Sequence, residues 1–315
     1  MMTPRAAIEA AIRFEPYDGP VPHLELEFQL ADEMFGEHAI RWREFETIPK
    51  HKRRDELVRN ARLWIRIAEG LGWNAITGIH WLPVEEQIET FRLIREFSGD
   101  RFMLTTGLTG SQGIPSSDEI GPLVAKMAED PDSLMEDLEA LCAGAIRDIE
   151  ALTAGGADLV FLLTDYAYNQ GPFFSPAMFR RYVSPFAKRC VDAIHKGGAF
   201  AIQHSDGDLT MLLDQMLEWG LDGLQSIDPM AGMDIAAVRA KVGKRWCLFG
   251  NVNCAYLQHG TADQIEESAR YCLEHGPVDG TGYVYTSSNC IFEGVPPENY
   301  RTMLAVREAW TRTTH

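Results

Sequence analysis

The chain alternates between short apolar runs and longer segments in which apolar residues recur with helical spacing. Strict alternation of strands and helices predicts a parallel sheet, and eight such units favour a closed barrel over an open doubly wound sheet. No glycine-rich dinucleotide-binding motif follows the first strand, which also disfavours an open nucleotide-binding sheet. We therefore predict an α/β protein, a (β/α)8 TIM barrel with an N-terminal helical extension at residues 4–14, forming one domain over residues 1–315. The predicted strands are centred near residues 24, 75, 104, 161, 201, 225, 248 and 284.

The apolar run at residues 199–203 ends abruptly in the polar residues His204, Ser205 and Asp206, and residues 209–219 after it have helical spacing. In parallel α/β folds, ligands bind in the loops that follow the carboxyl ends of the strands. Other predicted strands also end in polar groups, and in a barrel all of these ends meet at one mouth. The polar groups expected there are Glu25, Glu27, His80, residues 109–112, Asp165, Tyr166, His204, Asp206, Asp228, Asn251, Asn253, Asn289 and Cys290.

The first predicted strand alternates polar and apolar residues, with His23, Glu25 and Glu27 on one face. If the barrel is closed, its outer face must be apolar to meet the helices, so these three residues point inward. Carboxylates inside a barrel are costly unless they are paired or bind a cation. An exposed edge strand explains the same alternation equally well, because its glutamates then lie in water.

Composition narrows the classes of function. The net charge of −17 disfavours binding to nucleic acid or to an anionic membrane surface, since both need clustered Lys and Arg. The N-terminus is too polar for a signal sequence and no apolar run is long enough to cross a membrane, so we expect a cytoplasmic protein. The six cysteines are scattered singly, which indicates free thiols, any of which could bind a metal. The sequence does not indicate an oligomeric state.

Two interpretations fit the polar groups at the mouth. In the first, His204, Asp206 and Cys290, with an inward glutamate, supply nitrogen, oxygen and sulfur donors to a tetrahedral Zn²⁺ that keeps one position open. In the second, His204 is a hydrogen-bonded pocket residue, Cys290 is a small buried hydrophobe and Asp206 caps the following helix. Asp165 is then a turn residue, Tyr166 lies at the edge of the core, and His80 is structural.

Several stretches resemble the uroporphyrinogen decarboxylase superfamily. They are residues 165–176 (DYAYNQGPFFSP), residues 204–207 (HSDG), residues 250–253 (GNVN), residues 288–290 (SNC) and residues 296–299 (PPEN). The resemblance covers residues 155–310 strongly and the N-terminal third weakly. It implies a (β/α)8 barrel, in agreement with the strand count, and one of two chemistries: cofactor-free decarboxylation of a porphyrinogen, or zinc-dependent methyl transfer among small molecules, thiols and corrinoid proteins.

The resemblance is closer to the methyltransferase branch. The decarboxylase branch carries an arginine-rich signature near its first strand, where this chain has Glu25 and Glu27. His204 and Cys290 match two of the three usual zinc ligands of the methyltransferase branch, and Asp206 stands where that branch has a third ligand, a cysteine. A set with one cysteine leaves zinc more electrophilic, which suits activation of a methyl donor.

The resemblance thus implies a zinc-dependent methyltransferase that demethylates a small O- or N-methylated substrate. The methyl group passes to a thiol or to a corrinoid protein, which would be a separate polypeptide. The expected roles are metal binding by His204, Cys290 and Glu27, catalysis by Asp165, Tyr166 and Asp206, and substrate binding by Glu25, His80, Asn251 and Asn289. The alternatives are a metal-free decarboxylase and a non-catalytic barrel that binds a small ligand.

Overall fold

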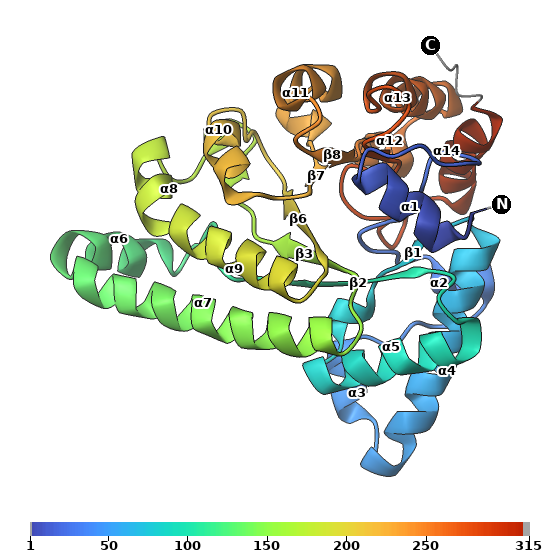
Figure 1. Cartoon of the computed structure of the whole chain (residues 1–315), viewed down its shortest axis with the longest axis horizontal. Coiled ribbons are helices and arrows are strands. Elements are labelled where there is room, and N and C mark those ends of the chain that lie inside the picture. Colours follow the sequence, from blue (N-terminus) through green and yellow to red (C-terminus); the bar gives the residue numbers. More distant parts are fainter. Residues whose placement is uncertain (1, 311–315) are drawn as a thin grey trace.

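The computed structural model describes residues 2–310, and its centre is a curled parallel sheet of seven strands ringed by helices (Figure 1). The strands follow the order β1-β2-β3-β6-β7-β8-β9, so each strand pairs with the next one along the chain that belongs to the sheet. The predicted α/β barrel fold is confirmed. The strands are β1 (Ala75–Ile76), β2 (Met103–Leu108), β3 (Leu159–Leu163), β6 (Phe200–Ser205), β7 (Gly223–Ser226), β8 (Cys247–Phe249) and β9 (Tyr283–Val284), and a separate antiparallel hairpin joins β4 (Ala167–Tyr168) to β5 (Gly171–Pro172).

The predicted first strand near residue 24 is not a regular strand, but its segment occupies the eighth position. His23 forms an isolated parallel bridge with Tyr285, which follows β9. On the other side, the His23 carbonyl accepts a hydrogen bond from the backbone N–H of Asn74, which precedes β1, at 2.7 Å. Residues 21–28 therefore run between the last and the first strands of the sheet.

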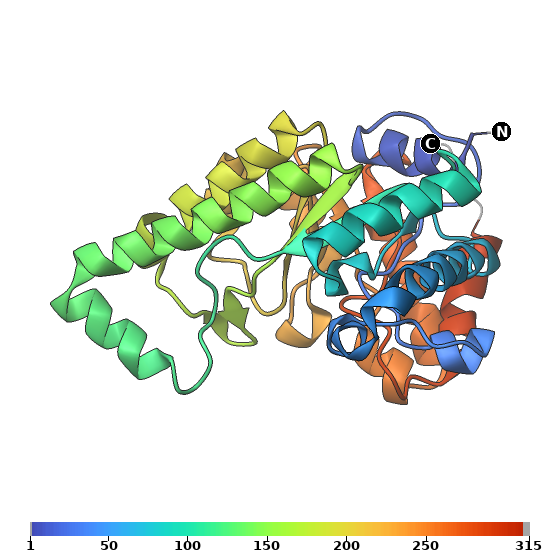
Figure 2. The ribbon, with the colours of Figure 1, turned by 90° about the horizontal axis from the view of Figure 1, so that it is seen from below.

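Helices cover the outside of the sheet. The α7 and α9 helices lie side by side, and α6 packs at the far end of α7, where the two project from the body of the protein (Figure 2). Asp130 and Pro131 cap and start α7, as their positions in the sequence predict. The segment predicted to be helical over residues 209–219 forms only α10 and a short 3-10 turn. The helices are α1 (Pro4–Ile12), α2 (Ala31–Phe35), α3 (Trp42–Thr47), α4 (Lys50–Gly70), α5 (Val84–Ser98), α6 (Ile120–Glu129), α7 (Pro131–Ala154), α8 (Pro176–Tyr182), α9 (Ser184–Lys196), α10 (Leu213–Met216), α11 (Ile235–Val242), α12 (Cys254–His259), α13 (Ala262–His275) and α14 (Pro297–Ala309).

The interior of the barrel is a packed apolar cluster that is separate from the larger core under the helices. Alternate strand residues such as Phe161, Ile202 and Phe249 meet there, as the two-residue period of a strand requires. Ile8 and Ile12 of α1 belong to the same cluster. The α1 helix thus closes the end of the barrel at which the strands begin.

The first segment turns a different face inward from the one expected for a closed barrel. Leu24 and Leu26 belong to the interior cluster, whereas His23 packs against Tyr285 and Tyr300, with its ring centroid 5.7 Å and 6.4 Å from theirs. Glu25 is fully buried as well, so the segment is not an exposed edge strand either. The alternation arises because both faces are covered, one by the barrel interior and the other by α14.

Candidate functional site

Three ligand-type side chains come together where β3 and β6 end. His204 is on β6, Asp206 follows it, and Asp165 follows β3. The His204 Nε2 atom lies 3.8 Å from Asp165 Oδ1 and 4.0 Å from Asp206 Oδ1. The ligand atoms of the three residues all lie within 4.8 Å of one another, and Asp165 is exposed while His204 is buried. One imidazole nitrogen and two carboxylate oxygens at this spacing can hold a divalent cation.

The orientation of His204 is set by Gln225 on the neighbouring strand β7. The His204 Nδ1 atom is hydrogen-bonded to Gln225 Oε1, and Gln225 Nε2 donates to the Ser287 carbonyl at 3.5 Å. A carbonyl only accepts, so the Gln225 amide nitrogen must face Ser287 and its oxygen must face His204. Nδ1 therefore carries a proton, and Nε2 faces the two aspartates. This arrangement is typical of a histidine that ligates a metal.

Asp206 is held by donors on both of its oxygens. Ser226 Oγ donates to Oδ1 at 2.7 Å, and Asn289 Nδ2 donates to Oδ2. Burial raises the pKa of Asp206, and the nearby charges of Asp165 and Asp228 act in the same direction, while His204 and Ser226 oppose the shift. Negative charge therefore accumulates at this point of the mouth, a condition that a bound cation relieves.

Cys290 and Glu27, the other two predicted metal ligands, pair with each other. The Cys290 thiol donates to Glu27 Oε2 at 3.6 Å. Burial first, and then the charge of Glu27, raise the pKa of Cys290, so the sulfur keeps its proton. Glu27 also accepts a hydrogen bond from Gln29 at 3.1 Å and lies 3.7 Å from the Arg41 guanidinium. Among residues 2–310 the compact metal-type cluster holds His204 but neither Cys290 nor Glu27.

The remaining predicted residues lie in different surroundings. His80 is next to the mouth, where burial first, and then the charges of His204 and Arg41, lower its pKa to about 4 and keep it neutral. The Tyr166 side chain is buried, its hydroxyl is hydrogen-bonded to Ser111 Oγ at 2.7 Å, and its ring packs against Phe179 and Trp219.

Asn251 and Glu25 are both buried in the wall of the barrel. Asn251 donates to the Ile227 carbonyl at 2.6 Å and accepts from the Cys272 thiol at 3.3 Å. Glu25 Oε2 accepts from Thr286 and from the backbone and side chain of Ser287 at 2.6–3.1 Å. Burial raises the pKa of Glu25 to about 7 despite these donors.

The structure adds Gln225, which the sequence reasoning missed. It occupies a fully buried position of β7. A glutamine inside an apolar strand could have indicated this role. A buried amide needs hydrogen-bond partners, and the neighbouring strand carries His204.

A tight backbone contact positions the loop that carries Asp206. Gly207 has a φ of +85°, and a Cβ on it would come within 2.1 Å of the Ala167 carbonyl oxygen. Only glycine fits there, because any side chain would collide with the β4–β5 hairpin. The hairpin therefore packs directly against the turn that follows Asp206.

Comparison with known proteins yields a family and a set of folds. Residues 86–310 match the family model described as uroporphyrinogen decarboxylase (URO-D). A methyltransferase from Methanosarcina mazei has the same fold at a TM-score of 0.72 and 19% identity, covering 98% of this chain and 99% of that one. A B12-independent methionine synthase from Shewanella sp. W3-18-1, in complex with selenomethionine, superposes at a TM-score of 0.56 and 11% identity over 92% of this chain and 94% of that one. No curated protein matches the chain significantly.

Proposed function

Because the chain belongs to the uroporphyrinogen decarboxylase (URO-D) family, we propose that it is a methyltransferase of that family, dependent on zinc, which demethylates a small O- or N-methylated substrate. The acceptor is a thiol or a corrinoid carried by a separate protein. The fold shared with a methyltransferase and with a methionine synthase supports the class of reaction. The observation that carries the proposal is the convergence of His204, Asp165 and Asp206 at the mouth.

The donors at the mouth fit a zinc ion. His204 directs Nε2, and Asp206 and Asp165 direct carboxylate oxygens, to the same point. Cys290 and Glu27 are the remaining donors of the predicted set, and they lie beside each other in a protonated pair. In this proposal His204, Asp206 and Asp165 hold the ion. Cys290 joins them only if its proton passes to Glu27, its hydrogen-bond partner.

Zinc would supply Lewis acidity, which polarises the oxygen or nitrogen that bears the methyl group. The protein supplies orientation: Gln225 aims His204, and Asn289 and Ser226 fix the two oxygens of Asp206. Neutral His80 can offer a hydrogen bond to the substrate but carries no charge at pH 7. Asp165, the most exposed of the three cluster residues, faces the position where a substrate enters.

Decarboxylation of a polycarboxylate fits the mouth less well. Asp165, Asp206 and Asp228 repel a substrate with several carboxylates, and Arg41 is already beside Glu27. A non-catalytic ligand-binding barrel would leave the aimed histidine without a purpose. These two alternatives differ from the proposal in zinc content and in turnover.

The test combines metal analysis with a methyl-transfer assay. Purified protein is assayed for zinc by mass spectrometry, and methoxylated aromatics and methylated amines are offered with cob(I)alamin or a thiol as acceptor. We expect one zinc per chain and turnover of at least one donor class. The His204→Ala variant should lose both, whereas His259→Ala, which changes an exposed histidine of α12, should keep both.

The proposal fails if the wild-type protein binds no zinc after incubation with the metal, or if His204→Ala retains it. Release of carbon dioxide from a carboxylated substrate without metal would instead support the decarboxylase.

A further inference from the structure

Two cysteines lie in contact between α7 and α9, outside the strand-end cluster. The sulfur atoms of Cys142 and Cys190 are 4.0 Å apart, and both side chains are fully buried. Among residues 2–310 no other two cysteines are hydrogen-bonded to each other. The structure has these thiols free, so the pair is a buried dithiol.

We propose that Cys142 and Cys190 form an oxidation site, at which hydrogen peroxide or a small-molecule disulfide converts the two thiols into a protein disulfide that loosens the loop leading to the mouth. A disulfide needs the sulfur atoms about 2 Å apart. The two side chains must therefore approach each other by about 2 Å, which is within reach of rotamer and helix adjustments. The 24-residue α7 and the 13-residue α9 carry one cysteine each, so the new bond would tie the two helices together.

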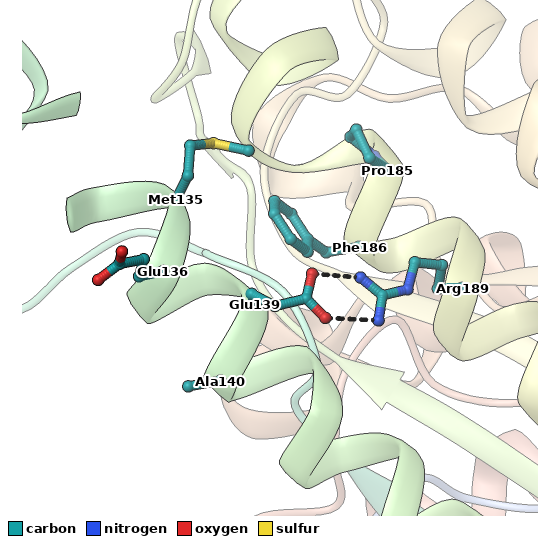
Figure 3. Close-up of a pocket in the computed structure, with 7 residues that line it drawn as sticks. All are labelled: Met135, Glu136, Glu139, Ala140, Pro185, Phe186 and Arg189. Carbon is teal, nitrogen blue, oxygen red and sulfur yellow. Dashed lines mark hydrogen bonds and ion pairs between the residues drawn. The ribbon is translucent and has the colours of Figure 1, made fainter. Parts of the chain in front are cut away.

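A surface groove lies next to the pair. Its lining comes from α7 and α9, and includes Met135, Phe186 and the ion pair of Glu139 with Arg189 (Figure 3). The groove has a volume of about 600 Å³. The Phe186 carbonyl accepts a hydrogen bond from the Cys142 thiol at 3.6 Å, so the floor of the groove and the dithiol are in direct contact. Opening of the exposed Glu139–Arg189 pair gives a small oxidant access from this side.

The two thiols are not equivalent. The contact between the two sulfur atoms lowers the pKa of Cys142, burial opposes this shift, and the Arg189 guanidinium lowers the pKa further. The same contact and burial raise the pKa of Cys190. Cys142 is hydrogen-bonded to Phe186, which lines the groove, so in this proposal Cys142 is the nucleophile of the pair and Cys190 is the resolving thiol.

The reaction balances with either oxidant. The Cys142 thiolate attacks one peroxide oxygen, the O–O bond breaks, and a sulfenic acid and one water result. Cys190 then attacks the sulfenic sulfur, the S–S bond forms, and a second water leaves with the remaining thiol proton. With a small disulfide, Cys142 forms a mixed disulfide and releases one thiol, and attack by Cys190 releases the second.

The consequence for the mouth follows from what Cys190 contacts. Its thiol donates to the Gly110 carbonyl at 3.6 Å, and a Cβ on Gly110 would come within 2.5 Å of the sulfur, so the loop after β2 is packed directly on Cys190. Oxidation removes the thiol proton and pulls the sulfur toward α7. The same loop is bonded to the strand end of Asp165, because Ile114 donates to the Asp165 carbonyl at 2.9 Å.

The test is oxidation of the protein in a Cys254→Ser background, which removes the only cysteine of the six that is not fully buried. After treatment with hydrogen peroxide or glutathione disulfide, denatured protein is titrated for thiols and digested for peptide mapping. We expect the loss of two thiols, one Cys142–Cys190 cross-linked peptide, and full reversal by dithiothreitol. Cys142→Ala and Cys190→Ala should form no cross-link, whereas Cys247→Ala, which changes a buried cysteine of β8, should form it normally.

The coupling to the mouth is measured by hydrogen–deuterium exchange of residues 109–115, a readout that does not depend on zinc or on methyl transfer. The exchange rate of these amides should rise several-fold when the Cys247→Ala control is oxidised. The same treatment should leave the exchange rate of the Cys142→Ala variant unchanged. Retention of all thiols, or a cross-link between other cysteines, would overturn the oxidation site. A cross-link with unchanged exchange at residues 109–115 would overturn the coupling.

Discussion

The protein contains two pairs of a histidine and a carboxylate at the same separation. His204 Nε2 lies 3.8 Å from Asp165 Oδ1 at the mouth, and His23 Nε2 lies 3.8 Å from Glu25 Oε1 in the wall under α14. Both histidines direct Nδ1 at an acceptor, the Gln225 amide oxygen for His204 and the Tyr285 carbonyl for His23. The residue types and the geometry of the two pairs are thus nearly the same.

The pairs differ in what faces Nε2. In the wall, the Tyr300 hydroxyl lies 3.1 Å from His23 Nε2 and occupies its lone pair, and every group is buried. At the mouth, two aspartates face His204 Nε2, and Asp165 is half exposed. A histidine next to a carboxylate is therefore structural when its lone pair is occupied, and available for chemistry when the lone pair faces anionic groups and solvent.

The largest expected effect comes from His204→Ala. Removing the ligand nitrogen should lower zinc affinity by more than the roughly 10- to 100-fold that loss of a supporting residue costs. The unfolding midpoint without metal should fall only modestly, because the main loss is the hydrogen bond to the buried Gln225. Metal titration measures the affinity and thermal unfolding measures the midpoint. A large loss of stability without a loss of zinc affinity would show that His204 has a structural role, as His23 does.

Next comes the pH dependence of stability at Glu25. Burial raises its pKa from 4.5 to about 7, so the folded state keeps a proton that the unfolded state releases. Stability from this group is therefore fully present below about pH 4.5 and falls as pH rises to about 7, by roughly 3 kcal/mol in total.

The Glu25→Gln variant should lack this decline, since its amide does not titrate. Urea unfolding from pH 4 to pH 8 gives the free energy of unfolding of both proteins, and the difference between them is the quantity of interest. The pKa of His23 is lowered by burial and then by Arg307, so His23 adds stability as pH rises toward 6.5. The wild type and the Glu25→Gln variant share this contribution of His23, so subtracting one unfolding free energy from the other removes it. Parallel curves would show that Glu25 is ionised in the fold.

A smaller effect is expected for Gln225→Leu. The leucine has a similar volume but no acceptor for Nδ1, so His204 loses its fixed tautomer and zinc affinity should fall by about tenfold. Calorimetric titration measures the affinity, and Gln215→Leu, a substitution of a buried glutamine near α8, serves as the control. Equal affinities of Gln225→Leu and the wild type would show that Gln225 does not orient the histidine.

The smallest effect is expected for Tyr300→Phe. The hydroxyl faces His23 and accepts from Trp73 Nε1 at 3.2 Å, and losing it should lower the free energy of unfolding by about 1 kcal/mol. Zinc affinity should not change. Denaturant unfolding measures the loss, and a change in zinc affinity would contradict the separation of the two pairs.

The sequence predicts the order of the strands and the polar groups at their ends. Both follow from local properties, namely the spacing of apolar residues and the polar or glycine residues that end each apolar run. Seven of the eight predicted strands are found in the sheet. The inward face of residues 23–27 could not be predicted, since alternation identifies two faces but not which one meets the barrel interior when both are buried. The resulting error concerned Leu24, Leu26 and the environment of Glu25.

Part of the site could also be predicted from local sequence patterns. Asp165, His204 and Asp206 stand at the ends of two paired strands, so their proximity follows from topology once the strands are known. The pairing of Cys290 with Glu27, and the bonds of Asn251 with Ile227 and Cys272, depend on loop conformations that residue patterns do not encode.

The closure of one end of the barrel by α1 has a kinetic consequence. Since Ile8 and Ile12 fill that end, every molecule that reaches His204 enters and leaves through a single opening. On the proposed function, the methyl donor and the acceptor would approach His204 from the same side of the barrel. The demethylated product would then leave by the route that fresh donor uses, and would inhibit competitively when it accumulates.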